Sequence, residues 1–447
     1  MSPAPPSRSA VTEAEVRDEL TRTFTVCDGC RRCVSLCDVF PDLFDLLERF
    51  DDRDPGRFTP EQQDRLVDAC MHCGRCALDC PFHPGTAEHP AVAGPLAGPV
   101  TVDFPDLMRR ADLMRRANGH VGVRAQRTAV ALARTERHGR LGSRFATLVN
   151  RWTGSRPGSL ARRVLSVLTG VSATRPLPPF ASERFTRWAR RTGKPVGATA
   201  AGDGAVIVVP TCLVEYQDTV VGRDLVAVYE RLGVEYTIAE VGCCGAPSLA
   251  AGDLDGFRRT SERMVATLAA QLRRGPSEIV VPEPGCCATL RSDAPRYVGV
   301  DHADDAASVA AHVTDVAVHL LAASGDSDVV PAPQGSIVLH QSCRSRTIGA
   351  DTATADLLDR FGFDVHPVSG CAGGDAGWGW RHGNEATVGH AVARLTAAVG
   401  DARERCGPCA VVGGCSQANA SLTGEIDGEV THVVSAVARA MGVPASG

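Results

Sequence analysis

Two runs of cysteine between residues 27 and 80 share the spacing C-x2-C-x2-C-x3-C. The first run contains Cys27, Cys30, Cys33 and Cys37, and the second contains Cys70, Cys73, Cys76 and Cys80, followed by Pro81. In two-cluster bacterial ferredoxins with this spacing, three thiolates of a run hold one [4Fe–4S] cube and the fourth ligates the other cube. We therefore predict one cluster on Cys27, Cys30, Cys33 and Cys80, and a second on Cys70, Cys73, Cys76 and Cys37.

Zinc is the main alternative ligand for so many thiols. Zinc sites usually pair two short Cys or His knuckles, whereas each run here places four thiols within eleven residues. Soft thiolates also suit iron–sulfur clusters. The first run departs from the ferredoxin pattern at Asp38, where a proline usually follows the fourth cysteine, but its ligands are intact. The spacing favours iron–sulfur over zinc.

The composition is that of a globular metal protein. The chain has 447 residues with 44% hydrophobic and 22% charged residues, and it contains 18 Cys. This length predicts about two to four domains. The first ten residues lack the basic stretch and apolar core of a secretory signal, and cysteine-dense chains without such a signal are usually metal proteins of a reducing compartment. We predict a cytoplasmic protein, either free or peripheral at the inner face of the cell membrane.

A basic segment follows the cysteine runs. Residues 106–194 carry twenty Lys and Arg against four Asp and Glu, although the whole chain has a net charge of −5. Their periodicity predicts arginine-rich helices at 107–117, 124–137, 143–152, 159–169 and 182–191. Periodicity likewise predicts helices at 11–24 and within 40–69, on either side of the first run of cysteines. The segment 84–105 is rich in Pro and Gly and is expected to be a linker.

The helix at 159–169 leaves two interpretations open. Its apolar residues Leu160, Val164, Val167 and Leu168 fall on one face. A basic amphipathic helix with tryptophan nearby is typical of a peripheral membrane contact. Alternatively, these helices pack against the acidic remainder of the chain or against another subunit. No nucleic-acid-binding motif accompanies the charge, so we predict no nucleic-acid partner.

From residue 204 onward, short apolar strands alternate with amphipathic helices, and cysteines recur at a nearly constant offset. Cys212 and Cys343 are 131 residues apart, Cys243 and Cys371 are 128 apart, and Cys286 and Cys415 are 129 apart. Three cysteines that keep one register predict a duplicated α/β unit. In each copy the cysteines follow strand ends, where ligands gather in open α/β sheets.

The two copies differ in their ligands. The first supplies Cys212, Cys243, Cys244 and Cys286, enough for one cluster, with Cys287 as a neighbour. The second keeps Cys343, Cys371 and Cys415, but Ala372 replaces the partner of Cys244. An open iron, a non-cysteine ligand such as His340, or no cluster would follow. Cys406 and Cys409 lie outside the repeat and are either a ligand pair or structural thiols.

These patterns predict a multidomain fold of mixed α+β and α/β class. It comprises an α-helical, ferredoxin-like 2×[4Fe–4S] domain, an Arg-rich helical segment and two duplicated α/β Cys-Cys-Gly domains. The expected boundaries are 1–10 for a loose tail, 11–100 for the ferredoxin-like domain, 101–200 for the basic segment, 201–325 for the first Cys-Cys-Gly domain and 326–447 for the second.

Several motifs together resemble the heterodisulfide-reductase-like iron–sulfur subunits. Within them the chain is most similar to the iron–sulfur subunit of anaerobic glycerol-3-phosphate dehydrogenase and to the iron–sulfur subunits beside FAD-linked oxidases. The matching segments extend from about Cys27 to the C-terminus and include 102–109, 177–180, 210–212, 243–247, 250–254, 282–286 and 371–379. The resemblance implies electron transfer from a flavoprotein dehydrogenase, of glycerol-3-phosphate, glycolate or lactate type, to a quinone or similar acceptor.

The alternative function is reduction of a disulfide or another small substrate at a cluster in the Cys-Cys-Gly domains. In the heterodisulfide reductases, that chemistry needs a further Cys three residues after the last one. Here Thr289 and Ala418 occupy those places, which favours electron transfer. No G-x-G-x-x-G opens a helix after a strand, so we expect no flavin on this chain and an FAD-dependent partner subunit. The expected cofactors are two [4Fe–4S] clusters and one further cluster in the Cys-Cys-Gly region.

Overall fold

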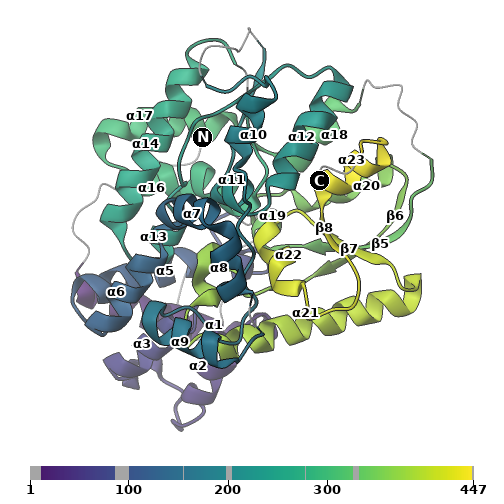
Figure 1. Cartoon of the computed structure of the whole chain (residues 1–447). Helices are drawn as coiled ribbons and strands as arrows, with labels where there is room; N and C mark the ends of the chain where they lie inside the picture. Colours follow the sequence, from purple (N-terminus) through teal and green to yellow (C-terminus); the bar gives the residue numbers. More distant parts are fainter. Residues whose placement is uncertain are drawn as a thin grey trace. The chain divides into compact units, whose positions relative to one another are not determined.

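The structure is a computed structural model of the chain (Figure 1). It describes residues 12–85, 100–154, 156–197, 204–276, 278–325 and 332–444. The chain divides into two compact units, Met1–Gln126 and Arg127–Gly447. Among the described residues, no helix has the length and apolar character needed to cross a bilayer.

In its described part, the first unit is helical. Its elements are α1 (Glu13–Cys30), α2 (Val39–Leu47), η1 (Pro55–Arg57), α3 (Pro60–Asp68), α4 (Arg75–Leu78) and α5 (Phe104–Ala117). Helix α1 begins at a capping box, in which the Thr12 hydroxyl accepts the Glu15 N–H at 3.3 Å and the Glu15 carboxylate accepts the Thr12 N–H at 2.7 Å. Leu20, Phe24, Phe40, Leu43 and Phe104 are among the buried side chains of its core.

Two helices of this unit differ from the sequence prediction. The helix predicted at 11–24 continues to Cys30, because the backbone turns only at Arg31, which has a left-handed φ of 54°. The helical pattern within 40–69 is divided by Pro55 and Pro60 into α2, η1 and α3. The predicted linker 84–105 lies largely outside the described residues.

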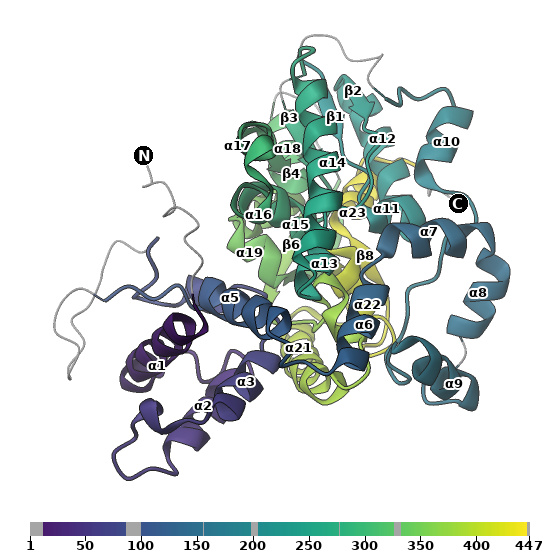
Figure 2. The ribbon, with the colours of Figure 1, turned by 90° about the vertical axis from the view of Figure 1, so that its left-hand side faces the viewer.

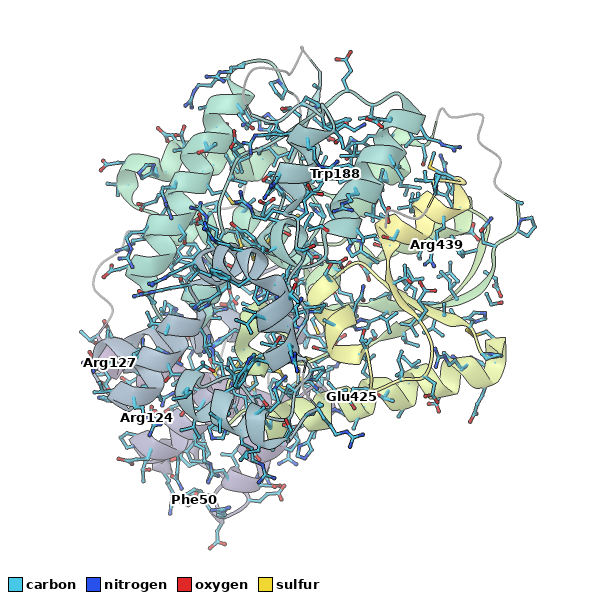
Figure 3. The ribbon with its side chains drawn as sticks, viewed as in Figure 1. Phe50, Arg124, Arg127, Trp188, Glu425 and Arg439 are labelled. Atoms are coloured by element: carbon cyan, nitrogen blue, oxygen red, sulfur yellow. A yellow bond between two sulfur atoms is a disulfide. The ribbon has the colours of Figure 1, made fainter. Side chains whose placement is uncertain are left out.

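The basic segment forms helices, as its periodicity predicts. They are α6 (Val123–Leu132), α7 (Thr135–Arg144), α8 (Ala146–Thr153), α9 (Leu160–Thr169) and α10 (Phe185–Arg191). Arg124 and Arg127 of α6 and Trp188 of α10 are labelled in Figure 3. The single helix predicted at 124–137 is wrong: the chain leaves the helical conformation at Arg134, with ψ of 53°, and α7 begins at Thr135.

The remainder of the second unit contains two four-stranded sheets in which all paired strands are parallel. The first sheet has the order β2-β1-β3-β4 and the second β6-β5-β7-β8. Figure 2 shows the first sheet among its helices. The strands are β1 (Val206–Val208), β2 (Tyr236–Ile238), β3 (Glu278–Val281), β4 (Val313–Asp315), β5 (Gly335–Gln341), β6 (Phe363–Ser369), β7 (Ala410–Gly413) and β8 (Val430–His432).

Helices connect these strands. Around the first sheet they are α11 (Cys212–Tyr216), α12 (Thr219–Leu232), α13 (Ala246–Ala250), α14 (Leu254–Leu272), α15 (Pro284–Ala288), η2 (Thr289–Asp293), α16 (Ala294–Tyr297), η3 (Val300–His302), α17 (Ala303–His312) and α18 (Val316–Ala323). Around the second they are α19 (Cys343–Thr347), α20 (Asp351–Arg360), η4 (Asp375–Trp380), α21 (Glu385–Cys406), α22 (Ser416–Leu422) and α23 (Val433–Ala440).

The two sheets share one hydrophobic core. Helix α12 packs on α23, and α18 packs on α20. Buried residues of both sheets, including Val206, Val208, Ile337 and Leu339, belong to the same cluster. The strand ends that carry the cysteines are therefore held by a continuous packed interior.

Candidate metal centres

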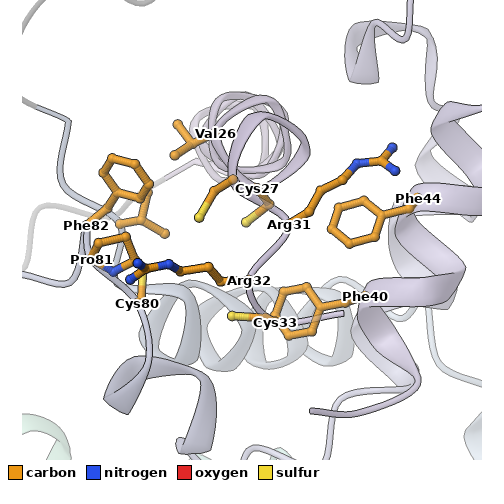
Figure 4. A pocket seen from close by; sticks show the side chains of 12 residues that line it. Val26, Cys27, Arg31, Arg32, Cys33, Phe40, Phe44, Cys80, Pro81 and Phe82 are labelled. Carbon is orange, nitrogen blue, oxygen red and sulfur yellow. The ribbon is translucent and has the colours of Figure 1, made fainter. Parts of the chain in front are cut away.

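In the first unit, one pocket is lined by the four cysteines predicted to hold the first cluster. Cys27, Cys30, Cys33 and Cys80 line this pocket, which is open to solvent on one side, together with Phe40, Phe44 and Phe82. Figure 4 shows the sulfur atoms of Cys27, Cys33 and Cys80 turned toward the same space. Cys27 and Cys30 lie in the last turn of α1. The structure thus brings Cys80 to the three thiols of the first run.

The electrostatics of these thiols reflect the same grouping. Burial raises the pKa of Cys27 far above its ordinary value, and the nearby Cys33, Cys80 and Cys30 raise it further. Burial likewise raises the pKa of Cys33 to about 12, with further contributions from Cys80 and Cys30. The thiols therefore hold their protons without metal, and because iron binds thiolates, loading has to release those protons.

The other four cysteines form a second set. The pKa of Cys76 is raised mainly by burial and then by Cys73, Cys70, Cys37 and Cys33, in that order. Cys37 of the first run thus acts on Cys76 of the second run. The Cys70 sulfur accepts the His72 N–H at 3.4 Å. Cys80 thus lines the pocket of the first run, and Cys37 acts on Cys76 of the second run. The full exchange of the fourth cysteines between the two clusters stays a prediction.

The iron-free protein should lose stability as the pH rises above about 9. Burial raises the pKa values of Cys33 and Cys70 to about 12 from an ordinary value of 9.0. Between pH 9 and pH 12 the thiols of the unfolded chain lose their protons while those of the folded chain keep them, so a rise in pH favours unfolding. Below pH 9 the thiols are protonated in both states, and their full contribution to the free energy of unfolding is present. Urea unfolding at pH 8 and pH 10 should show a lower midpoint at pH 10. A Cys33→Ser/Cys70→Ser variant should reduce the difference, and an unchanged difference would contradict the prediction.

In the second unit, Cys212, Cys243, Cys244 and Cys286 come together at the strand ends of the first sheet. Cys212 opens α11, whose N-terminus is capped by the Thr211 hydroxyl. Cys243 and Cys244 precede Gly245, which has a left-handed φ of 95° and no room for a Cβ beside Phe257. The turn after the paired cysteines therefore requires glycine.

Contacts between sulfur atoms define this site. The Cys244 and Cys286 sulfurs are 3.3 Å apart, and Cys243 forms hydrogen bonds with Cys212 and Cys244. The Gly245 N–H donates to the Cys243 sulfur at 3.4 Å. Hydrogen bonds from Cys212 and Cys244, followed by those from Thr135 and Gly245, lower the pKa of Cys243 well below its ordinary value.

Thr135 is a site residue that sequence reasoning missed. Its hydroxyl lies 3.3 Å from the Cys243 sulfur, to which it donates. It opens α7, which lies against α11 because Gly139 leaves space for the ring of Tyr216. Thr135 precedes Cys243 by 108 residues, so no local spacing could have pointed to it.

The second sheet repeats part of this arrangement. The Ser342 hydroxyl caps α19, which Cys343 opens. The Gly373 N–H donates to the Cys371 sulfur at 3.3 Å, as Gly245 does to Cys243, and Gly373 has a left-handed φ of 64°. The Cys343 sulfur lies 3.7 Å from the Gly370 carbonyl oxygen. The turns around Cys343 and Cys371 therefore resemble those of the first site.

Two other candidates for the second site have different partners. His340 Nε2 lies 3.1 Å from the Gly370 carbonyl oxygen, and it must donate to that oxygen because a carbonyl only accepts. Nε2 is then protonated, so only the other ring nitrogen, Nδ1, could bind iron. Cys406 and Cys409 form a disulfide with each other, so the structure does not present them as a ligand pair.

Cys415 has an acidic neighbour, Glu283, which comes from the first sheet. The carboxyl oxygens of Glu283 accept the Ser416 N–H at 3.1 and 3.2 Å, and the Cys415 side chain also hydrogen-bonds to it. Burial raises the pKa of Glu283 to about 8. Sequence reasoning missed this contact.

The donor chemistry fits iron–sulfur clusters. Among the described residues, no three His, Cys, Asp or Glu side chains are spaced to hold a single metal ion. The ligands of a four-iron cube each bind a different iron and so need not converge on one point. Four soft thiols at the ferredoxin pocket and four at the first Cys-Cys-Gly site provide the ligand type and number that such clusters need.

Comparisons with known families identify two domains. A model of the 4Fe–4S dicluster domain matches residues 26–83, and a model of the cysteine-rich CCG domain matches residues 206–291. The first spans all eight cysteines of the two runs, and the second contains Cys212, Cys243, Cys244 and Cys286. The chain is therefore an iron–sulfur protein with a CCG domain.

Similar proteins share part of the chain. Lactate utilization protein A of Bacillus cytotoxicus is 30% identical over 153 residues, which is 33% of this chain and 61% of that protein. Lactate utilization protein A of Bacillus cereus strain G9842 is 30% identical over 172 residues, 36% of this chain and 69% of that protein. The chain thus spans less than two thirds of the first relative. A solved aspartate racemase homologue from Pyrococcus horikoshii matches with a TM-score of 0.25 and 12% identity, covering 54% of this chain and 98% of that protein. This score is too low to indicate a shared fold.

Proposed function

Since the chain belongs to the family of lactate utilization protein A, we propose that it carries electrons in a flavin-linked dehydrogenase complex. An FAD-dependent subunit would oxidise the substrate, and this chain would pass the electrons to a quinone or a similar acceptor. The name of the relatives makes lactate the first substrate to test, followed by glycolate and glycerol-3-phosphate.

The grouping of the cysteines carries this proposal. The pocket lined by Cys27, Cys30, Cys33 and Cys80 would hold one cube, and Cys37, Cys70, Cys73 and Cys76 would hold the other. Cys212, Cys243, Cys244 and Cys286 would hold a third cluster. Bound clusters supply one-electron transfer, while the chain sets their potentials through burial and through hydrogen bonds to sulfur, such as those from Thr135 and Gly245.

One contact favours electron transfer over disulfide reduction. Thr289 stands where the reductases need a further cysteine, and its hydroxyl donates to the Gly285 carbonyl at 2.9 Å. The Thr289 side chain is therefore hydrogen-bonded within its own helical segment. It offers no thiolate to a substrate or a cluster.

We also propose that the two α/β halves are copies of one unit, with domain boundaries near those predicted. The shared strand order, the hydroxyl caps before Cys212 and Cys343 and the matching N–H···S bonds at Cys243 and Cys371 support duplication. Helices α12 and α20 occupy equivalent places in the two halves, as do α18 and α23. Helix α12 packs on α23 and α20 packs on α18, so the same contact occurs twice between the halves.

A genetic experiment tests the proposed function. In a strain of the native host that lacks this chain, we expect growth on lactate to be lost and to return with the wild-type chain. A Cys27→Ser/Cys70→Ser chain, which lacks one ligand of each cube, should not restore it. Normal growth of the deletion strain on lactate, glycolate and glycerol-3-phosphate would contradict the proposal.

The peripheral membrane contact is part of the same proposal, and helix α9 supports it. Its polar Arg162 and Ser166 face the protein interior, where they are 1% and 7% exposed. The Arg162 guanidinium donates to the carbonyl oxygens of Thr153, Ser172 and Arg175. Leu160, Val167 and Leu168 on the outer side are 79%, 70% and 78% exposed. The helix therefore presents its apolar face outward, contrary to the interpretation in which this face packs on the chain.

Neighbouring residues support an anionic lipid surface as the proposed occupant. Leu148 and Trp152 of α8, the helix beside α9, are 60% and 54% exposed. The exposed arginines of α8, α9 and the segment between them are Arg151, Arg156 and Arg163, and Arg144 is exposed at the end of α7. Apolar side chains flanked by arginine and tryptophan match the headgroup region of an anionic bilayer.

Replacing two apolar residues of α9 should weaken binding to lipid. We expect Val167→Asp/Leu168→Asp to weaken binding to anionic phospholipid vesicles at least about tenfold. Two apolar side chains that would enter the bilayer are lost, and two negative charges are added. Flotation measures the bound fraction. Val300→Asp, at an apolar residue of η3 that is 81% exposed, is the matched control and should bind as wild type does. Equal binding by all three proteins would contradict the prediction.

A further inference from the structure

We propose that Glu283, from the first α/β half, supplies the fourth ligand of the second Cys-Cys-Gly site, with Cys343, Cys371 and Cys415. The second site would then be built by both halves of the unit. The inference rests on the proposed binding of an iron–sulfur cluster in this region.

The position of Glu283 is the first argument. It follows β3 directly and lies three residues before Cys286, yet its carboxyl group contacts Cys415 and Ser416 of the second half. The residue is 2% exposed. Its carboxyl group is thus enclosed beside a cysteine predicted to bind the second cluster.

The missing thiol gives the second argument. In the first site, the Cys244 sulfur lies 3.3 Å from that of Cys286. Cys286 corresponds to Cys415 in the second half, and Cys244 corresponds to Ala372, which is buried. A thiol at position 372 would therefore be expected beside Cys415. The Glu283 carboxyl group is hydrogen-bonded to that same cysteine.

Charge gives the third argument. Within the part of the chain that the structure describes, no Lys, Arg or His forms an ion pair with Glu283, and the charged group that acts on it most is another acid, Asp218. Buried carboxylates are usually paired with a cation or bound to a metal. Without such a partner, burial holds the carboxyl group of Glu283 in its neutral form, and iron would supply the positive charge that favours the carboxylate. A carboxylate keeps further lone pairs for a metal while it accepts the Ser416 N–H.

The ligand set would make the two Cys-Cys-Gly clusters chemically different. The first has four soft thiolates, whereas the second would have three and one hard oxygen donor. Carboxylate oxygen suits iron in thiolate-rich clusters less well than sulfur does. We therefore expect the iron bound to Glu283 to be the one most readily lost from the second cluster.

The test uses the full chain with Cys244→Ala, which removes a ligand of the first Cys-Cys-Gly cluster. After anaerobic reconstitution, iron above the approximately eight atoms of the two cubes then reports the second site. Adding Glu283→Gln, which keeps the size of the side chain but removes its charge, should lower this iron by at least about one atom per chain. The electron paramagnetic resonance signals of the cubes should not change. Adding Ala372→Cys to Glu283→Gln should restore the iron by supplying the missing thiolate.

Several results would overturn the inference. One is unchanged iron and an unchanged spectrum after Glu283→Gln. Another is the loss of all clusters together without rescue by Ala372→Cys, which would assign Glu283 to folding. A third is found before Glu283 is replaced: the Cys244→Ala protein contains the iron of both cubes but none at the second Cys-Cys-Gly site. That result would overturn the inference and leave the proposed function intact. Absence of iron from the cubes as well would instead reject the proposed function.

Discussion

Replacing Cys80 with serine is expected to remove the cluster of the first cysteine run, although Cys80 belongs to the second run. Cys80 lines the same pocket as Cys27, Cys30 and Cys33, and burial together with Cys30 raises its pKa. Without this thiolate, the cube lacks one of its four ligands. Reconstituted protein should lose up to about four of the eight irons of the two cubes, together with one of their two resonance signals.

Double variants test this exchange of ligands directly. Cys80→Ser combined with Cys27→Ser should lose no more iron than either single variant, because both residues serve one cluster. Cys80→Ser combined with Cys70→Ser should lose the iron of both cubes. Cys37→Ser is the matched control. Its loss of iron should be non-additive with that of Cys70→Ser and additive with that of Cys27→Ser. If Cys80→Ser were non-additive with Cys70→Ser instead, each run would hold its own cluster.

Cys244→Ala should remove the cluster of the first Cys-Cys-Gly site and leave the ferredoxin pair spectroscopically intact. Cys244 contacts both Cys243 and Cys286, so its loss opens the ligand set at its centre. About four irons should disappear from the total. We expect lactate-dependent electron transfer to fall by at least about tenfold, because the chain of carriers is interrupted.

Cys287→Ala is the control for this variant. Cys287 is adjacent to Cys286 but fully buried, and after burial the group that raises its pKa most is Asp315. Its replacement should leave iron content and cluster spectra unchanged. If Cys244→Ala abolished all cluster signals together, the residue would be needed for folding and would not define a separate site.

The dicluster and Cys-Cys-Gly domains could be predicted because their cysteine motifs are local. Each ferredoxin run lies within eleven residues, and the left-handed turn at Gly245 ties the paired cysteines to a glycine that follows them directly. Short apolar runs at 205–209, 278–282, 336–340 and 410–412 also gave the central strands β1, β3, β5 and β7. The edge strands β2, β4, β6 and β8 were missed, because polar residues interrupt their apolar pattern.

Other features depend on contacts between distant residues. Thr135 reaches Cys243 across 108 residues, and Glu283 reaches Ser416 across 133. The periodicity of α9 revealed an apolar face but not whether this face points into the protein or toward solvent. The orientation of the helix depends on three carbonyl groups elsewhere in the chain that accept hydrogen bonds from Arg162. Such features follow from how the helices pack rather than from the residues of one element.

The central claim is that the chain carries iron–sulfur clusters in both its dicluster and its Cys-Cys-Gly regions. The most direct test is to purify the full chain without oxygen, reconstitute it, and count iron while recording resonance spectra during a reductive titration. We predict about twelve irons or more per chain and a third reducible species besides the two cubes, lost in Cys244→Ala. About eight irons and only two species would contradict the claim, since the Cys-Cys-Gly halves would then hold no cluster.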